Sequence, residues 1–306
     1  MLPFWAWIPI TIGAALAQTA RNTAQRSLTA QAGTLGATLV RFMYGLPFAG
    51  FWVALLYLWP GSTATVTAPF DARYFAWIVT GAVSQIAATA FLLAAMKERN
   101  FVVAVTYSKT EVMQVAVFSS LFLHELPGAV VLTAICLATA GVLLVSLPRA
   151  AVDGGVSAWG GKVVAYGLAS GACFALSAVG YRGASLVLGS GTPPWLAGAW
   201  GVLWAQGIQT ILLGGWIVAR TPDVIGKVIG AWRVSLWAGC MGAVASIGWG
   251  TAFAMTTAAQ VRTLGMVEVL FSYLVSRRLL REKLARTEQV GLMLVAAGLV
   301  LVCSQL

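Results

Sequence analysis

Long apolar runs separated by short polar loops fill this chain from end to end. A helix needs about 20 mostly apolar residues to cross the hydrocarbon core of a membrane, and ten such runs lie between turn signals such as Pro127-Gly128. The predicted spans are residues 4–28, 34–58, 74–96, 101–123, 128–147, 160–187, 194–219, 231–255, 259–280 and 286–304. We therefore predict an all-α integral membrane protein with ten transmembrane helices.

The composition agrees with a chain that lies in lipid. Of the 306 residues, 59% are apolar and 9% are charged, whereas soluble domains carry about a quarter charged residues. The net charge of +10 sits mainly in loops between apolar runs, which indicates contact with lipid headgroups and argues against nucleic acid as a partner. A single histidine, His124, and scattered acids argue against an enzyme, and no nucleotide, cofactor or metal motif is present.

The chain contains an internal duplication. A shift of 157 residues carries Glu111 to Glu268 and Gly141 to Gly298, and a shift of 158 carries Gly13 to Gly171. Each copy holds five predicted helices, and because five is odd the second copy must enter the membrane from the opposite side. The expected organisation is two inverted five-helix repeats, residues 1–147 and 159–306, joined by a linker over residues 148–158.

Positive charges predict the orientation. Lysines and arginines gather in the loops after odd-numbered helices, from Arg21 and Arg26 after the first to the basic segment 277–286 after the ninth. Cytoplasmic loops carry an excess of such residues. Both termini are therefore expected outside the cell, in a multi-pass protein of the inner (cytoplasmic) membrane.

Several short motifs resemble a known family. Ala95-Met96-Lys97, Leu123-His124-Glu125 and Ala140-Gly141-Val142, together with Leu39-Val40-Arg41-Phe42, resemble the pattern of EamA-type transporters of the drug/metabolite transporter superfamily. The resemblance implies ten helices in two inverted repeats, with a central cavity lined by helices 1–4 and 6–9. It also implies export of amino acids or other metabolites, and the aromatic amino acid exporters are one branch of the family to which the chain is similar.

The chain departs from the family in two respects. Val112 and Val269 stand where the family usually has proline after the helix 4 and helix 9 glutamates, so a kink there has no proline to produce it. The family usually places both termini in the cytoplasm, and here the charge distribution takes precedence.

Charged residues inside apolar runs are candidate site residues, because such groups usually face a cavity or a partner. Arg41 and Lys109 are suited to a substrate carboxylate, and Glu111 and Glu268 to an amine or to proton uptake during transport. The alternative is a purely structural pair, for instance Arg41 with Glu111.

Polar and aromatic residues extend the candidate site. Gln18 and Asn22, one turn apart, predict either a cavity wall or an interhelical hydrogen-bond seam, and Trp200 and Trp204 either a stacking wall or helix packing. The candidate substrate-binding residues are Gln18, Asn22, Arg41, Gln85, Tyr107, Lys109, Glu111, Gln114, Trp200, Trp204, Trp249 and Glu268.

The expected function is that of a secondary transporter. It would export or exchange small metabolites, foremost amino acids, by alternating access at a central cavity. H⁺ is the candidate coupling ion, membrane lipids are the surroundings, and the protein is expected as a monomer or homodimer. The alternatives are a lipid-linked sugar flippase and a multidrug exporter of the same fold.

Overall fold

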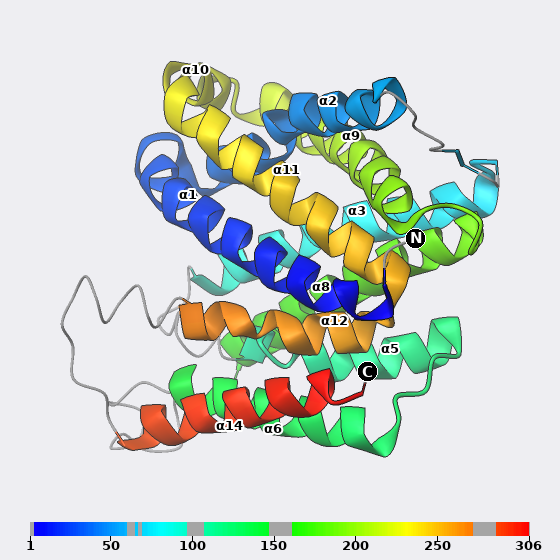
Figure 1. Ribbon diagram of the computed structural model, residues 1–306. Helices are drawn as coiled ribbons and strands as arrows, with labels where there is room; N and C mark the ends of the chain where they lie inside the picture. Colours follow the sequence, from blue (N-terminus) through cyan, green and yellow to red (C-terminus); the bar gives the residue numbers. More distant parts are fainter. Residues whose placement is uncertain are drawn as a thin grey trace. The chain divides into compact units, whose positions relative to one another are not determined.

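Every regular element is a helix in the part of the chain that the computed structural model describes, which is residues 3–59, 65–66, 69–96, 107–146, 161–271 and 286–305 (Figure 1). The elements are η1 Phe4–Ala6, α1 Trp7–Met43, α2 Gly45–Leu58, α3 Ala72–Met96, α5 Glu111–Leu123, α6 Ala129–Ser146, α8 Lys162–Leu188, α9 Pro194–Arg220, α10 Asp223–Gly230, α11 Trp232–Met255, α12 Ala258–Gly265 and α14 Arg286–Cys303.

Seven helical segments among the described residues are long and apolar enough to cross a membrane. They are Ser27–Leu58, Ala72–Ala94, Ala129–Ser146, Lys162–Leu188, Pro194–Arg220, Trp232–Met255 and Arg286–Cys303, and the apolar helix Glu111–Leu123 is shorter. The expectation of an all-α, multi-pass membrane protein is thereby confirmed. Predicted spans 4–28, 101–123 and 259–280 are not among the seven, and parts of the last two lie outside the described residues.

The start of the chain differs from the prediction. A loop was expected over residues 29–33, but the helix continues through it and changes direction at Gly33, whose φ of 71° lies in the left-handed region that glycine tolerates. Leu28, just before the expected loop, and Ala32, within it, are buried in a cluster that includes Val228 of α10. Burial against this short helix keeps the segment helical, and the second predicted span instead breaks again at Tyr44.

The chain divides into two compact units, residues 1–83 with 180–256 and residues 84–179 with 257–306. Helices α3 and α8 each contribute to both units. The units combine segments of both predicted repeats, so this division is not the predicted division into halves, which stays a prediction.

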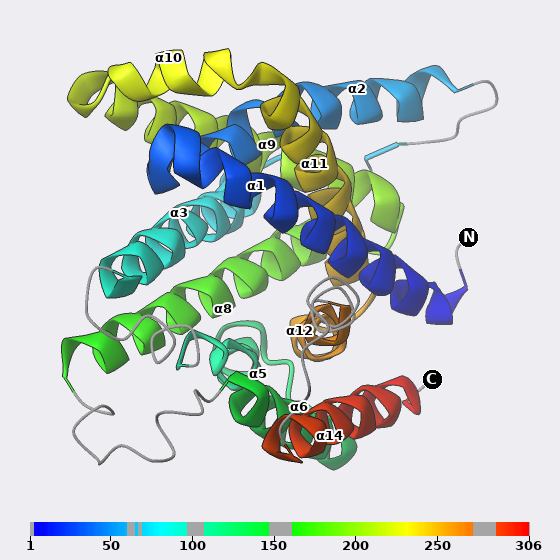
Figure 2. The same cartoon turned by 90° about the vertical axis from the view of Figure 1, so that its left-hand side faces the viewer.

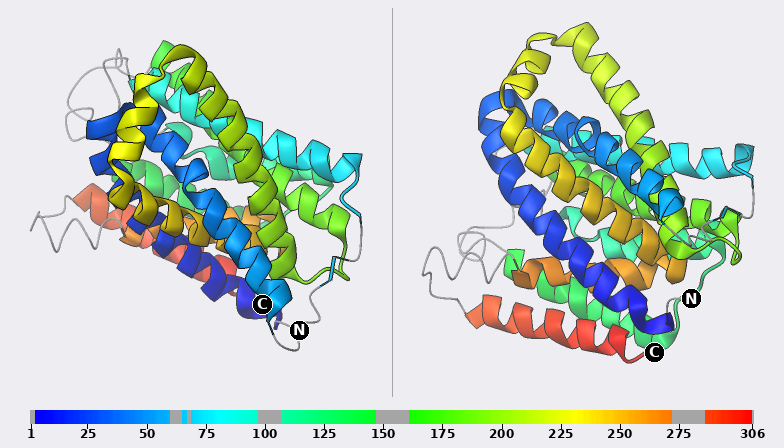
Figure 3. Two further views of the ribbon diagram at one scale, coloured as in Figure 1. Left: turned by 90° about the horizontal axis from the view of Figure 1, so that it is seen from above. Right: turned by 45° about the horizontal axis from the view of Figure 1, so that its top comes forward.

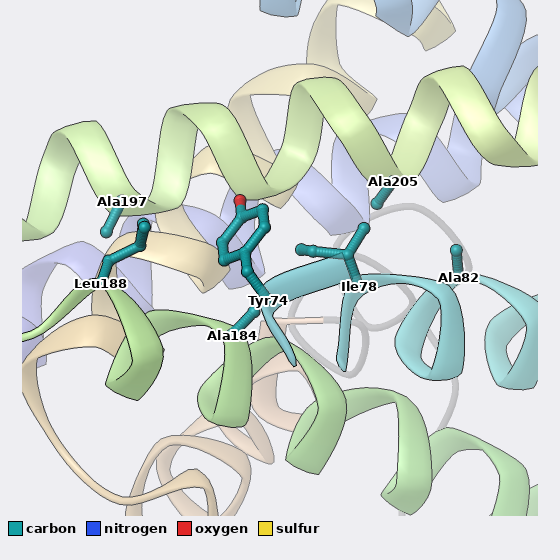
Figure 4. Close-up of a cluster of buried hydrophobic side chains, with 7 residues drawn as sticks. All are labelled: Tyr74, Ile78, Ala82, Ala184, Leu188, Ala197 and Ala205. Atoms are coloured by element: carbon teal, nitrogen blue, oxygen red, sulfur yellow. The ribbon is translucent and has the colours of Figure 1, made fainter. Parts of the chain in front are cut away.

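The first unit has α1 packed along α11, which also contacts α9 and α2 (Figure 3). A buried apolar cluster joins α3, α8 and α9 (Figure 4), and its members are Tyr74, Ile78, Ala82, Ala184, Leu188, Ala197 and Ala205. Four of the seven are alanines, and small residues let membrane helices approach closely.

In the second unit α6 and α14 lie side by side (Figures 1 and 2). A Cβ added at Gly141 of α6 would lie 2.5 Å from the carbonyl oxygen of Gly291 and 2.7 Å from the backbone nitrogen of Val295. Side chains do not fit at that distance, so Gly141 is the residue that allows α14 to approach.

The same contact occurs a second time in the opposite direction. A Cβ added at Gly298 of α14 would lie 2.8 Å from the carbonyl oxygen of Ala134 and 2.9 Å from the backbone nitrogen of Ala138 on α6. The shift of 157 residues carries each residue of one contact to a residue of the other: Gly141 to Gly298, Ala134 to Gly291 and Ala138 to Val295. The early part of one helix meets the late part of the other, so the two helices are antiparallel and their contacts are reciprocal.

Candidate functional site

The helix that carries Glu111 is interrupted just before that residue. Lys109 and Thr110 form a turn, and α5 begins at Glu111. The Thr110 backbone N–H donates to the Tyr107 carbonyl oxygen at 3.2 Å, and the Thr110 hydroxyl donates to the same oxygen at 2.7 Å. A side chain that bonds the backbone in this way competes with regular helix bonding. The break therefore forms without a proline, since Val112 follows Glu111.

A second interruption lies at the equivalent place in the other copy. Helix α12 ends at Gly265, Met266 forms a turn, and helical structure resumes at residue 267, one residue before Glu268. Tight bonds close this turn, from the Met266 N–H to the Thr263 carbonyl oxygen at 3.1 Å and from the Val269 N–H to the Met266 carbonyl oxygen at 2.9 Å. The shift of 157 carries Lys109 to Met266. Both copies thus break directly ahead of their glutamates.

Glu111 and Arg262 form an ion pair across these two interrupted helices. A guanidinium Nη2 of Arg262 donates to Oε1 of Glu111. The Glu111 side chain is 10% exposed and that of Arg262 is 23% exposed. Glu111 is in the first turn of α5 and Arg262 in the last turn of α12. The dipole of each helix therefore stabilises the charge that its terminus carries.

The backbone of α8 packs against the start of α5. A Cβ added at Gly171 would lie 3.0 Å from the Ser108 carbonyl oxygen, 3.2 Å from Nε2 of Gln114 and 3.4 Å from the Glu111 backbone nitrogen. That Gln114 nitrogen donates to the Thr110 hydroxyl oxygen at 2.9 Å. Gly171 thus allows α8 to pack against the start of α5, and Gln114 braces the turn before it.

Arg262 is the site residue that the sequence analysis missed. It lies inside an apolar segment, which is a usable signal, but it is 151 positions from its partner. The nearest acid along the sequence, Glu268, lies beyond the turn at Met266 that ends α12. The pairing of Arg41 with Glu111, offered as an example, is replaced by Arg262 with Glu111.

In the first unit Gln18 and Asn22 of α1 each accept a hydrogen bond from another side chain. The indole N–H of Trp249, which is buried at 8% exposure, donates to Oε1 of Gln18 at 3.1 Å. Asn22 is exposed, and its Oδ1 accepts from Nη2 of Arg21 at 2.7 Å. For Gln18, this favours the interhelical seam over the cavity wall.

Arg21 and Arg41 both lie against α11. A Cβ added at Gly242 would be 3.3 Å from Cδ of Arg21 and 3.8 Å from Cγ of Arg41. Arg21 is only 5% exposed. It lies within α1 and was counted among the loop charges that predict the orientation, so one of those charges belongs to the protein interior.

Trp200 and Trp204 belong to an aromatic cluster. Their rings stack with centroids 6.2 Å apart and planes 23° apart. Phe70 packs 5.1 Å from Trp200, and Phe75 packs 5.2 Å from Trp204. The Trp200 indole N–H donates to the Tyr57 hydroxyl oxygen at 3.2 Å. The rings are in contact with one another, which favours helix packing over a substrate wall.

The remaining candidates are half-buried. Tyr107 and Lys109 lie at the first helix break, Glu268 follows the second, and Gln85 lies on α3. The structure thus gathers Tyr107, Lys109, Glu111 and Gln114 around one break, and their role in binding stays a prediction.

Comparison with known proteins identifies the fold and no family. No protein-family model matches the chain, and no curated protein matches it. One similar solved structure, described only as a crystal structure of a protein, has a TM-score of 0.71 at 17% sequence identity and covers 97% of this chain and 96% of its own. Likeness at this identity concerns the fold and carries no function.

Proposed function

We propose that the chain is a secondary transporter that exports or exchanges small metabolites, foremost amino acids of aromatic or broad range, by alternating access at a central cavity. The observation that carries the proposal is the Glu111–Arg262 ion pair, buried between two helices that are interrupted at repeat-equivalent positions. The resemblance of the chain's sequence motifs to EamA-type transporters also supports a secondary transporter.

The free-energy cost of placing charged side chains inside a membrane makes the Glu111–Arg262 pair informative about function. A charge at the centre of a bilayer costs about 2.5–3.5 kcal/mol on insertion scales, and such residues usually mark substrate or ion pathways. Interrupted helices in membrane carriers expose backbone groups and helix termini to the substrate. Glu111 and Arg262 combine both features in one place.

The reciprocal contacts of α6 and α14 support the proposed architecture of ten spans in two inverted repeats. Reciprocal contacts between antiparallel helices imply a local two-fold axis perpendicular to both. For helices that cross a membrane, this axis lies in the membrane plane, which is the geometry of inverted repeats. The proposed location is the inner membrane, with H⁺ as coupling ion and a monomer or homodimer as the working state.

Two measurements test the function. Metabolites of cells that overexpress the protein are compared with those of cells that lack it, and an amino acid depleted inside and enriched outside the overexpressing cells is expected. Purified protein in liposomes should then take up that radiolabelled amino acid. Transfer of a fluorescent sugar-linked lipid between leaflets, without amino acid uptake, would contradict the proposal and favour the flippase.

Site variants connect the activity to the residues. Glu111→Gln and Arg262→Gln are expected to lower uptake at least about tenfold, since each removes one member of the largely buried ion pair. Glu288→Gln, in the first turn of α14, is the matched control and should retain uptake.

A further inference from the structure

We propose that the Glu111–Arg262 ion pair is the closed form of the binding site. A zwitterionic substrate would open it by separating the two side chains and binding to both of them. The substrate carboxylate would bind Arg262 and its ammonium would bind Glu111. The inference rests on the proposed function and adds to it the charge class of the substrate.

The first argument is chemical likeness. Arg262 already binds a carboxylate, that of Glu111, and a guanidinium presents a planar fork of donors that suits any carboxylate. Glu111 already binds a cation, and a primary ammonium offers three donors to a carboxylate. In the closed pair, the Glu111 carboxylate therefore occupies the place of the substrate carboxylate, and the Arg262 guanidinium occupies the place of the substrate ammonium.

The second argument is charge balance. The closed pair carries no net charge, and insertion of a zwitterion between the partners leaves the sum at zero. A ligand with only an amine or only an acid replaces one partner alone, so the summed charge of the pair and its ligand is no longer zero. From the cost of a charge inside a membrane, this should weaken binding on the order of 100-fold.

The third argument concerns access. Of the two side chains, Arg262 is the more exposed, at 23% against 10% for Glu111. Gly171 lets α8 pack against the Ser108 carbonyl and the Gln114 amide at the start of α5. An incoming ligand would therefore meet Arg262 first, with its carboxylate leading, and the ammonium would reach Glu111 as the pair opens.

The sequence predicts one such site per chain, although the glutamate occurs in both copies. Glu111 has an equivalent in Glu268, but the equivalent of Arg262 in the first copy is Val105. The repeat therefore does not generate a second copy of this pair, and one zwitterion per chain is expected.

Binding to the purified protein tests the charge class without requiring transport. The probes are phenylalanine and leucine, each with the amine that lacks the carboxylate and the acid that lacks the amine. Affinity is measured from the ligand-induced shift of thermal unfolding in detergent. The wild-type protein is expected to bind at least one zwitterion about 100-fold more tightly than its amine or acid.

Variants then assign the two ends. Glu111→Gln should change the preference toward the acid, and Arg262→Gln toward the amine, while Glu288→Gln keeps the wild-type order. The double variant Glu111→Arg/Arg262→Glu keeps an ion pair and should still prefer the zwitterion, so it decides the matter if a single variant does not fold.

Three results would overturn the inference: equal binding of zwitterion, amine and acid by the wild type, no binding of either zwitterion, or folded single variants that keep the wild-type order. Metabolite export with equal binding would reject the charge class and keep the transporter. Absence of both export and liposome uptake would reject the transporter itself.

Discussion

Replacing Gly141 with alanine is expected to destabilise the contact between α6 and α14. The new Cβ would lie 2.5 Å from the Gly291 carbonyl oxygen and 2.7 Å from the Val295 backbone nitrogen, whereas ordinary contacts of such an atom are 3.4–4 Å. Both nearby atoms belong to the backbone, so relief requires α14 to move away from α6.

The magnitude follows from two opposing effects. Overfilling a packed interface costs about 1–3 kcal/mol, and alanine in place of glycine inside a helix recovers about 1 kcal/mol. A net loss of up to about 2 kcal/mol is expected. Gly298→Ala should cost a similar amount, because its Cβ would meet the Ala134 carbonyl oxygen at 2.8 Å.

Unfolding of the purified protein in mixed detergent micelles, followed by titration with SDS, measures the effect. Gly215→Ala in α9 is the matched control, since no atom lies within 4 Å of its added Cβ. The control should be unchanged or stabilised by up to about 1 kcal/mol. If Gly141→Ala and Gly215→Ala change stability alike, the close approach of α6 and α14 is wrong. If Gly298→Ala behaves unlike Gly141→Ala, the reciprocity is wrong.

Three further predictions concern orientation, one buried hydrogen bond and one helix cap. A green fluorescent protein fused to the C-terminus should stay dark in cells, because that end is expected outside; bright fluorescence would reverse the orientation. Trp249→Phe removes the hydrogen bond to Gln18 and should lower stability by about 1 kcal/mol in the same SDS titration, while Trp216→Phe at an exposed position should not. Thr257→Ala removes the side-chain oxygen that accepts from the Gln260 N–H at the start of α12 and should also cost about 1 kcal/mol; an unchanged titration midpoint would remove the cap from the account.

The apolar pattern predicts most helix boundaries within a few residues. The run 128–147 became Ala129–Ser146, and the run 231–255 became Trp232–Met255, because apolar length and flanking turn residues are local properties of the chain. The expected loop at 29–33 failed, because burial of Leu28 and Ala32 beside α10 decides that segment. Such burial depends on residues almost 200 positions away.

The candidate site shows the same division between local and distant information. Glu111 stands out in the sequence because the duplication places a second glutamate at Glu268. Its partner Arg262 does not stand out. The 157-residue shift shows which residues are equivalent, but it does not show which residues of the two segments are in contact. The positions of Trp200 and Trp204 in the sequence left open a stacking wall for a substrate or helix packing. The rings of Phe70 and Phe75, which favour packing, come from the segment before α3 and from α3 itself.

Counterflow in liposomes tests the central claim, alternating access at a site that holds Glu111 and Arg262, most directly. Liposomes with the purified protein are loaded with a high concentration of the exported amino acid and diluted into a trace of the same radiolabelled compound. A carrier that alternates access should accumulate label transiently above its equilibrium level, and Arg262→Gln should lose this overshoot while Glu288→Gln keeps it. Label that merely equilibrates without an overshoot in the wild type, or an overshoot that survives in Arg262→Gln, would contradict the account.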